Sequence, residues 1–184
     1  MKRSNVWAVG GVGGAVLVIA GMALLYFLNP YHTASRDPRA RVIGAMMFRS
    51  RNDYMEPTIH RGSYFLLDTS AFSSRGPGRG DIVVLLVPKD RETVLTLRVI
   101  ATAGSTVEMR EGVVYLDGKE IEESYLPPPH PGATQTTMTP IKVPVNSYFV
   151  LGDNRMISYD SRSWGTVPKD LLVGRVQTLI FDKQ

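Results

Sequence analysis

Cysteine is absent from this sequence of 184 residues. Its absence excludes a disulfide framework and any metal site built on thiolates. Histidine is scarce as well, and the three present, His32, His60 and His130, have no i, i+3 or i+4 spacing. A histidine zinc site is therefore not expected. We predict a protein with no metal site and no cofactor.

No long block of one charge is present either, since 21 Lys and Arg stand against 17 Asp and Glu. That distribution argues against nucleic acid as a partner. The one notable basic cluster, Arg36, Arg39 and Arg41, lies just after a long apolar segment. This position favours contact with the headgroups of a lipid bilayer.

The apolar segment covers residues 6–28 and contains no charged side chain. As a helix it spans roughly 35 Å, enough to cross a bilayer. Lys2 and Arg3 before it also suit a cleaved signal peptide. The run is long for that purpose, however, and the only nearby small-residue cleavage site, ending at Ala34, is a poor one. We predict an uncleaved single-pass anchor, whose orientation the flanking charges do not decide.

The remainder of the chain predicts a mainly β domain. Short runs rich in Val, Ile, Leu, Tyr and Phe alternate with Gly, Pro, Asp and Asn, and no helical periodicity is sustained outside the anchor. Asp117-Gly118 is a hairpin turn signal. Residues 70–79 and the proline-rich residues 127–144 are expected to be loops. The candidate strands are residues 42–48, 64–67, 81–87, 95–101, 106–110, 113–116, 148–152 and 173–181.

The expected organisation therefore has four parts. These are a short N-terminal tail (1–5), a transmembrane anchor (6–28), a basic juxtamembrane linker (29–41) and a β domain (42–184).

Four motifs make this more than a generic β domain. They are Tyr-Met-Glu-Pro-Thr-Ile (54–59), Gly-Asp-Ile-Val-Val (80–84), Leu-Arg-Val-Ile-Ala (97–101) and Gly-Asp-Asn-Arg-Met-Ile-Ser-Tyr-Asp-Ser-Arg (152–162). In this order they resemble the motif boxes of bacterial type I signal peptidases, the S26 family. The corresponding family patterns are Ser-Met-x-Pro-Thr-Leu, Gly-Asp-Ile-Val, Lys-Arg-Val-Ile-Gly and Gly-Asp-Asn-Arg-x-x-Ser-x-Asp-Ser-Arg.

The resemblance implies two antiparallel β-sheets after one N-terminal transmembrane helix. It places the chain in the bacterial inner membrane, with its soluble domain on the outer, periplasmic face. It further implies that an extended segment of a signal peptide binds beside a strand. In active relatives a serine is the nucleophile and a buried neutral lysine is the general base.

Both reacting positions depart from the family pattern. Tyr54 stands at the nucleophile position, and its phenol is a poor acyl acceptor. Leu97 stands at the general-base position and has no proton-accepting group. We therefore expect no catalytic residue at this degenerate dyad. Ser50 and Ser63 flank the motif, but Lys89, the lysine nearest in sequence to position 97, is expected in an exposed loop where it stays charged.

The other motif residues have expected places of their own. The groove or oxyanion region is assigned to Asn52, Met55, Pro57 and Ser158. The structural box is assigned to Gly152, Asp153, Asn154, Arg155, Asp160 and Arg162. Within this box we expect an ion pair between Asp160 and Arg162, and loop backbone groups bound by Asp153 and Asn154. Ser158, which orients the lysine in active relatives, is expected here to hydrogen-bond to backbone.

The leading interpretation is a non-catalytic pseudo-peptidase of the export pathway. It would bind signal peptides or extended segments of exported proteins, with an active signal peptidase or a secretion complex as a further partner. An alternative is an active serine endopeptidase that removes signal peptides with a shifted or partner-supplied nucleophile. A further alternative is a structural subunit of a secretion complex.

Overall fold

The computed structural model describes residues 6–73, 75–127 and 136–181, with side chains from residue 14 onward. The predicted tail (1–5), the basic pair Lys2 and Arg3, and His130 lie outside the described residues.

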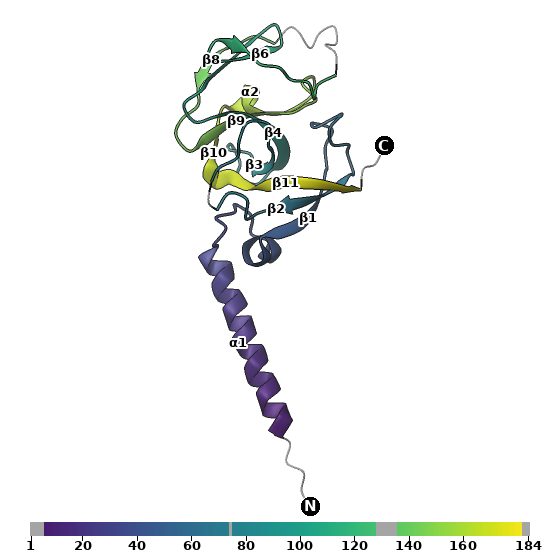
Figure 1. The fold of residues 1–184 in the computed structure, drawn as a ribbon, viewed down its shortest axis with the longest axis vertical. Helices are drawn as coiled ribbons and strands as arrows, with labels where there is room; N and C mark the ends of the chain where they lie inside the picture. The colour runs from purple at the N-terminus through teal and green to yellow at the C-terminus, as the bar shows by residue number, and fades with distance from the viewer. Residues whose placement is uncertain (1–5, 74, 128–135, 182–184) are drawn as a thin grey trace, which may run out of the picture.

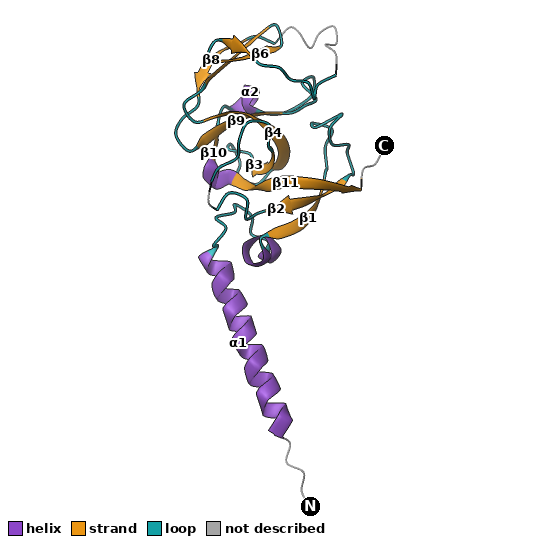
Figure 2. Ribbon diagram, in the orientation of Figure 1, coloured by secondary structure: helices purple, strands orange, loops and turns teal. Residues whose placement is uncertain are grey.

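A single long helix, α1 (Val6–Leu28), precedes the β domain and projects away from it (Figures 1 and 2). Its bounds coincide with the apolar segment, and its described side chains, such as Leu17 and Phe27, are largely exposed. Among residues described with their side chains, no helix is long and apolar enough to cross a membrane. The transmembrane anchor therefore remains a prediction.

The linker after α1 is held against the β domain by buried hydroxyl groups. Thr33 donates to the Val173 carbonyl at 2.6 Å, and Thr69 donates to the Ala40 carbonyl at 2.7 Å. A turn of π-helix, η1 (Arg39–Ile43), follows. The strand predicted to begin at Val42 is therefore wrong at its start. These apolar residues belong to η1, and the strand begins only after Gly44.

The larger sheet contains seven antiparallel strands in the order β1-β2-β11-β3-β4-β9-β10. Apart from the first, the predicted strands match the observed ones to within one residue at each end, and only the short β10 was not predicted. Among the described residues β1 pairs with β2 alone, so one side of β1 is a free sheet edge. The strands are β1 (Ala45–Arg49), β2 (Tyr64–Asp68), β3 (Ile82–Leu86), β4 (Val94–Thr102), β9 (Ser147–Leu151), β10 (Val167–Pro168) and β11 (Leu172–Phe181).

The smaller sheet has the order β7-β6-β5-β8 and lies at the end of the domain away from α1 (Figure 1). Its strands are β5 (Thr106–Arg110), β6 (Val113–Leu116), β7 (Lys119–Glu120) and β8 (Met138–Lys142). The hairpin signal is confirmed, because Asp117 and Gly118, both at positive φ, join β6 to β7.

Strand β8 corrects the prediction that residues 127–144 are all loop. Pro140 cannot donate to a ladder, but β8 is an edge strand, and its pairing with β5 is irregular between the Val107 and Met109 pairs. An edge strand with such a break tolerates a proline. Two short helices were also not predicted, namely α2 (Ser161–Trp164) and the 3₁₀ turn η3 (Lys169–Leu171).

Three apolar clusters form the core. The first lies on β3, β4 and β9 and includes Leu97. The second joins the two sheets through Ile100, Phe149 and Val107. The third lies under the 54–59 motif and includes Met55 and Ile59. Burial of this apolar area is the main force that holds the two sheets and the motif loops together.

Close approach of β11 to β2 generates the first prediction. A Cβ on Gly174 would come within 2.6 Å of the Asp68 carbonyl oxygen, which is backbone and cannot swing away. We expect Gly174→Ala to lower the free energy of unfolding by about 1–3 kcal/mol. Gly78→Ala is the matched control, because the nearest atom to its Cβ is 3.9 Å away. Thermal unfolding of the detergent-solubilised chain measures both, and equal stability of the two variants would contradict the packing described.

Candidate functional site

The 54–59 motif lies in a loop that closes on itself between β1 and β2. The Ser50 N–H donates to the Ser63 carbonyl, and the Gly62 N–H donates to the Ser50 carbonyl, both at 2.9 Å. Inside the loop the Asn52 side-chain oxygen accepts a hydrogen bond from the Tyr54 N–H at 3.3 Å. Asn52 therefore uses its carbonyl to shape the backbone at Tyr54.

Two residues predicted for the groove region lie on opposite sides of this loop. Met55 is buried in the core with Ile59 and Phe65, so it supports the loop from below and does not line its surface. Pro57 is exposed and follows a cis peptide bond from Glu56.

Tyr54 and Leu97, the two degenerate dyad positions, are brought to the same apolar cluster. Leu97 lies on β4 opposite Val83 and is fully buried. The Tyr54 side chain is partly buried and packs against the cluster that contains Leu97, as does Trp164. The position of the general base is thus occupied by core hydrocarbon, and an aromatic ring covers that part of the core.

The 152–162 box contacts the Tyr54 backbone directly. The Asn154 N–H donates to the Tyr54 carbonyl at 2.9 Å. No side chain fits at position 152, because a Cβ there would overlap the Ser158 side chain and lie 2.6 Å from the Tyr54 carbonyl oxygen. Gly152 therefore permits the two motifs to approach each other, and Asn154 joins them by its backbone.

Ser158 corrects an expectation. Its hydroxyl was expected to hydrogen-bond to backbone, but the Oγ atom is buried and has no hydrogen-bond partner among the described residues. Leu97 lies one residue from the Arg98–Leu151 pair of β4 and β9, and hence beside Gly152 and Ser158. A polar side chain at position 97 would offer Ser158 a partner, whereas leucine does not.

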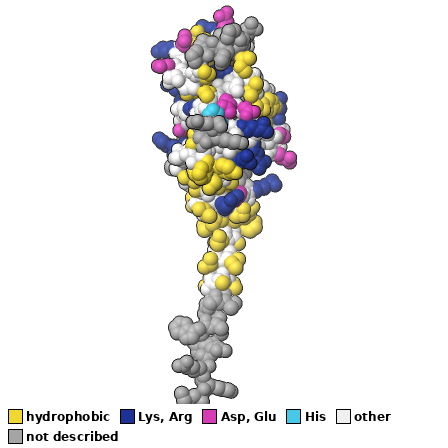
Figure 3. All heavy atoms as spheres, turned by 90° about the vertical axis from the view of Figure 1, so that its right-hand side faces the viewer, with side chains coloured by type: hydrophobic (Ala, Val, Ile, Leu, Met, Phe, Trp, Pro, Cys, Tyr) yellow, Lys and Arg dark blue, Asp and Glu magenta, His cyan; other side chains and the backbone are white. Residues whose placement is uncertain are grey.

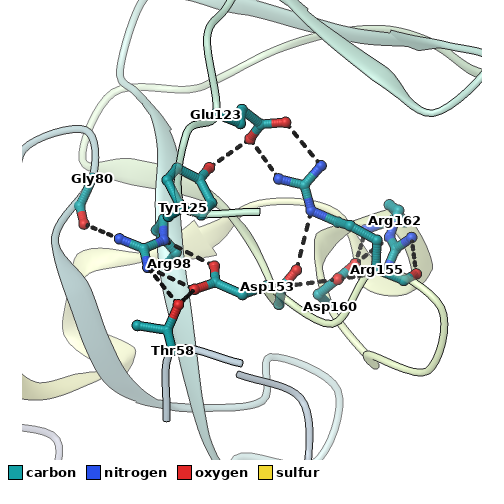
Figure 4. A network of polar contacts seen from close by, with 10 residues as sticks. Thr58, Gly80, Arg98, Glu123, Tyr125, Asp153, Arg155, Asp160 and Arg162 are labelled. Carbon is teal, nitrogen blue, oxygen red and sulfur yellow. Dashed lines mark hydrogen bonds and ion pairs between the residues drawn. The ribbon is translucent and has the colours of Figure 1, made fainter. Parts of the chain in front are cut away.

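Arg98, the residue after Leu97, forms a buried ion pair with Asp153 (Figure 4). Its Nε and one terminal nitrogen contact the two Asp153 oxygens at 2.8 and 2.6 Å, and its other terminal nitrogen donates to the Gly80 carbonyl at 3.1 Å. The Thr58 hydroxyl also donates to Asp153. The Asp153 side chain thus pairs with Arg98 and Thr58, and the prediction that it binds loop backbone is wrong.

A second buried pair, which the sequence did not indicate, joins this network. Arg155 contacts both oxygens of Glu123, and Glu123 also accepts from the Tyr125 hydroxyl (Figure 4). The Tyr125 ring lies 3.9 Å from the Arg98 guanidinium carbon, a cation–π contact. Glu123 and Tyr125 lie more than 25 residues before the box in a segment without periodicity, so no sequence pattern identified them.

The third pair, between Asp160 and Arg162, confirms the expected ion pair at 2.8 Å. Asp160 also accepts from the Gly152 N–H at 3.1 Å, and Arg162 donates to the Arg155 carbonyl at 2.7 Å. The box is therefore cross-linked internally, in addition to being fixed at both ends.

Burial and pairing shift the protonation of two groups in this network. Burial alone would lower the pKa of Arg98, but the hydrogen bonds and charge of Asp153 outweigh it and raise the pKa. Burial, and then the hydrogen bond to Glu123, raise the pKa of Tyr125. Both groups stay protonated at neutral pH, so the network offers no general base. Within the described ranges no three His, Asp or Glu side chains converge as metal ligands.

The comparisons with known proteins agree with this architecture. A family model described as signal peptidase, peptidase S26 matches residues 12–181. A probable signal peptidase I-2 of Synechocystis sp. is 37% identical over 126 residues, which are 66% of this chain and 56% of that protein. Signal peptidase I T of Bacillus subtilis is 28% identical over 188 residues, which cover 98% of this chain and 88% of that protein.

A solved signal peptidase I from Enterococcus faecalis shares 30% identity with this chain. The alignment covers 56% of this chain and 98% of that structure, with a TM-score of 0.49.

A mainly β domain with two antiparallel sheets and these motif boxes defines a protein of the signal peptidase I class. The chain belongs to the signal peptidase family, peptidase S26.

The buried pair generates the second prediction. Asp153→Asn keeps the shape of the side chain but leaves the Arg98 charge buried without a counter-charge. We expect a loss of about 3–5 kcal/mol in the free energy of unfolding. The control is Asp37→Asn, whose partner Arg39 is exposed, and there we expect a loss of at most about 1 kcal/mol. Thermal unfolding measures both, and similar losses would show that the Arg98 pair is not a structural centre.

Proposed function

We propose that this chain acts in protein export as a non-catalytic member of its family. It holds extended segments of signal peptides or exported proteins without cutting them. The observation that carries the proposal is the complete burial of Leu97 at the general-base position, with Tyr54 packed against the same cluster.

The chemical argument rests on what hydrolysis of a peptide bond requires. A hydroxyl nucleophile needs a neighbouring base to take its proton, and Leu97 has no lone pair to offer. Lys89 is exposed in the turn after β3, where solvent keeps its ammonium charged. Loss of such a nucleophile or base costs roughly a millionfold in turnover, about 8 kcal/mol of barrier.

The argument for binding rests on the free edge of β1. Its outer side offers backbone N–H and C=O groups to an extended segment, which can add to the sheet as a further strand. The loop that carries Tyr54 starts directly after β1, so a segment bound there would run toward Tyr54. The three ion pairs around Arg98, Arg155 and Arg162 keep the loop and the box in place whether or not chemistry occurs.

The proposal includes the location and partners expected from the sequence. Helix α1 anchors the chain in the inner membrane, and the β domain lies on the periplasmic face. There it meets signal peptides, the bilayer, and an active signal peptidase or a secretion complex. The apolar composition of residues 6–28 supports the anchor.

An active endopeptidase is the alternative, and the names of the relatives favour it, since they are called signal peptidases. Such an enzyme would need a shifted or partner-supplied nucleophile. Ser50 is 4% exposed and donates to the Asn52 carbonyl at 3.2 Å, and Ser63 is fully buried. Neither hydroxyl is presented to a bound peptide.

A serine-directed acylating probe separates the two functions. We expect no labelling of the wild-type chain in detergent, because Ser50 and Ser63 are buried. Labelling that disappears in Ser50→Ala or Ser63→Ala would establish the alternative. An active relative from Bacillus subtilis treated in parallel controls for the reactivity of the probe.

Restoring the reacting groups tests the proposal from the other direction. A pre-protein with an Ala-x-Ala signal peptide is offered to wild type, to Tyr54→Ser, to Leu97→Lys and to the double mutant. We expect wild type and both single mutants to be silent, because each lacks a nucleophile, a base or both. The double mutant is expected to gain cleavage, with Ser158 able to contact the new lysine.

Binding of the same pre-protein, measured beside cleavage, controls for damage by a buried lysine. A double mutant that still binds but does not cut leaves the scaffold intact and the proposal standing. Cleavage by wild type would refute it.

A further inference from the structure

Three large apolar side chains project from the 152–162 box beside Tyr54. Met156 is 58% exposed, Ile157 53% and Tyr159 37%. We call these three residues the apolar shelf. Exposed apolar side chains are ordinary when scattered singly, but three within four residues form a contiguous patch of the kind that marks an interaction site.

The shelf is held rigidly. Arg155, directly before it, is fixed by Glu123, and Arg162, just after it, is fixed by Asp160 and by the Arg155 carbonyl. The backbone turns back on itself, since the Ser158 N–H donates to the Asn154 carbonyl at 3.1 Å. Side chains presented on such a backbone lose little conformational entropy when a ligand binds.

The shelf is also continuous with the position of Tyr54. The Asn154 N–H binds the Tyr54 carbonyl, and the Tyr159 ring contacts the Trp164 ring at 6.5 Å. Trp164 in turn packs against the same core cluster as Tyr54. A segment that runs along β1 to Tyr54 therefore meets the shelf next.

Charge indicates what the shelf binds. The charged side chains between residues 153 and 162 are all paired, Asp153 with Arg98, Arg155 with Glu123 and Asp160 with Arg162. No free charge of this box is left to attract an ionic ligand or an anionic lipid headgroup. An uncharged apolar ligand matches the surface best, because Met and Tyr are favoured at interface cores from which charge is depleted.

We propose that the apolar shelf extends the peptide groove past Tyr54 and selects extended segments that carry large aliphatic side chains. This inference rests on the proposed function, since it needs a segment to be bound at β1 and Tyr54. It adds a substrate class, namely apolar rather than polar flanks, and assigns that selectivity to Met156, Ile157 and Tyr159.

The test compares two soluble fluorescent peptides of about ten residues. Both contain Ala-x-Ala; one has leucines on its two flanks, and the other has glutamines in their place. Binding to the full chain in nanodiscs is followed by anisotropy. We expect wild type to prefer the leucine peptide about tenfold, and Met156→Ser/Ile157→Ser to lose that preference.

The control is Val145→Ser, which changes another side chain that is 81% exposed. It should keep the preference. Retention of the preference in the double variant, or equal loss in Val145→Ser, would overturn the shelf. Wild type that binds both peptides equally refutes the shelf alone, whereas wild type that binds neither refutes the proposed function as well.

Contact with lipid is the competing occupant, and the absence of cysteine permits a clean test. A fluorophore on Ile157→Cys should respond to the leucine peptide and be insensitive to brominated lipid. Quenching by brominated lipid without peptide would show that the shelf lies on the membrane, and would overturn the proposal.

Discussion

The buried ion pair between Arg98 and Asp153 is the interaction on which the site depends. It connects three segments that are far apart in the sequence: β4, the box after β9, and the Thr58 end of the Tyr54 loop. A pair so deeply buried is no large source of net stability compared with hydrocarbon of equal volume, but removal of one partner is costly. Its effect is therefore specificity, because it fixes which loop meets which strand.

The same strand shows how a scaffold persists without its reacting group. Consecutive residues of β4 point to opposite faces. Leu97 points into the first core cluster, while Arg98 points toward Asp153, Thr58 and Tyr125. The base position therefore belongs to the core, and a leucine there is stabilised by burial. The adjacent position belongs to the polar network, whose function is structural. The buried, unpartnered Ser158 hydroxyl is the clearest trace of a polar group missing at position 97.

Much of the architecture could be predicted from the sequence, because the signals are local. Strand periodicity located β2, β3, β4, β5, β6, β9 and β11, and Asp117-Gly118 located a hairpin. The ion pair of Asp160 and Arg162 was predictable because its partners are two residues apart. What failed depends on tertiary context. Pro140 is tolerated because β8 lies at an edge, and Glu123 finds Arg155 only once the chain has folded.

The central claim is that this member of the S26 family holds a signal peptide and leaves it intact. Mass spectrometry of an Ala-x-Ala signal peptide, recovered after prolonged incubation with the wild-type full chain in nanodiscs, tests it most directly. The account predicts that the peptide co-purifies with the chain and is recovered at full length. Fragments ending at Ala-x-Ala, formed by the wild-type chain alone, would contradict it.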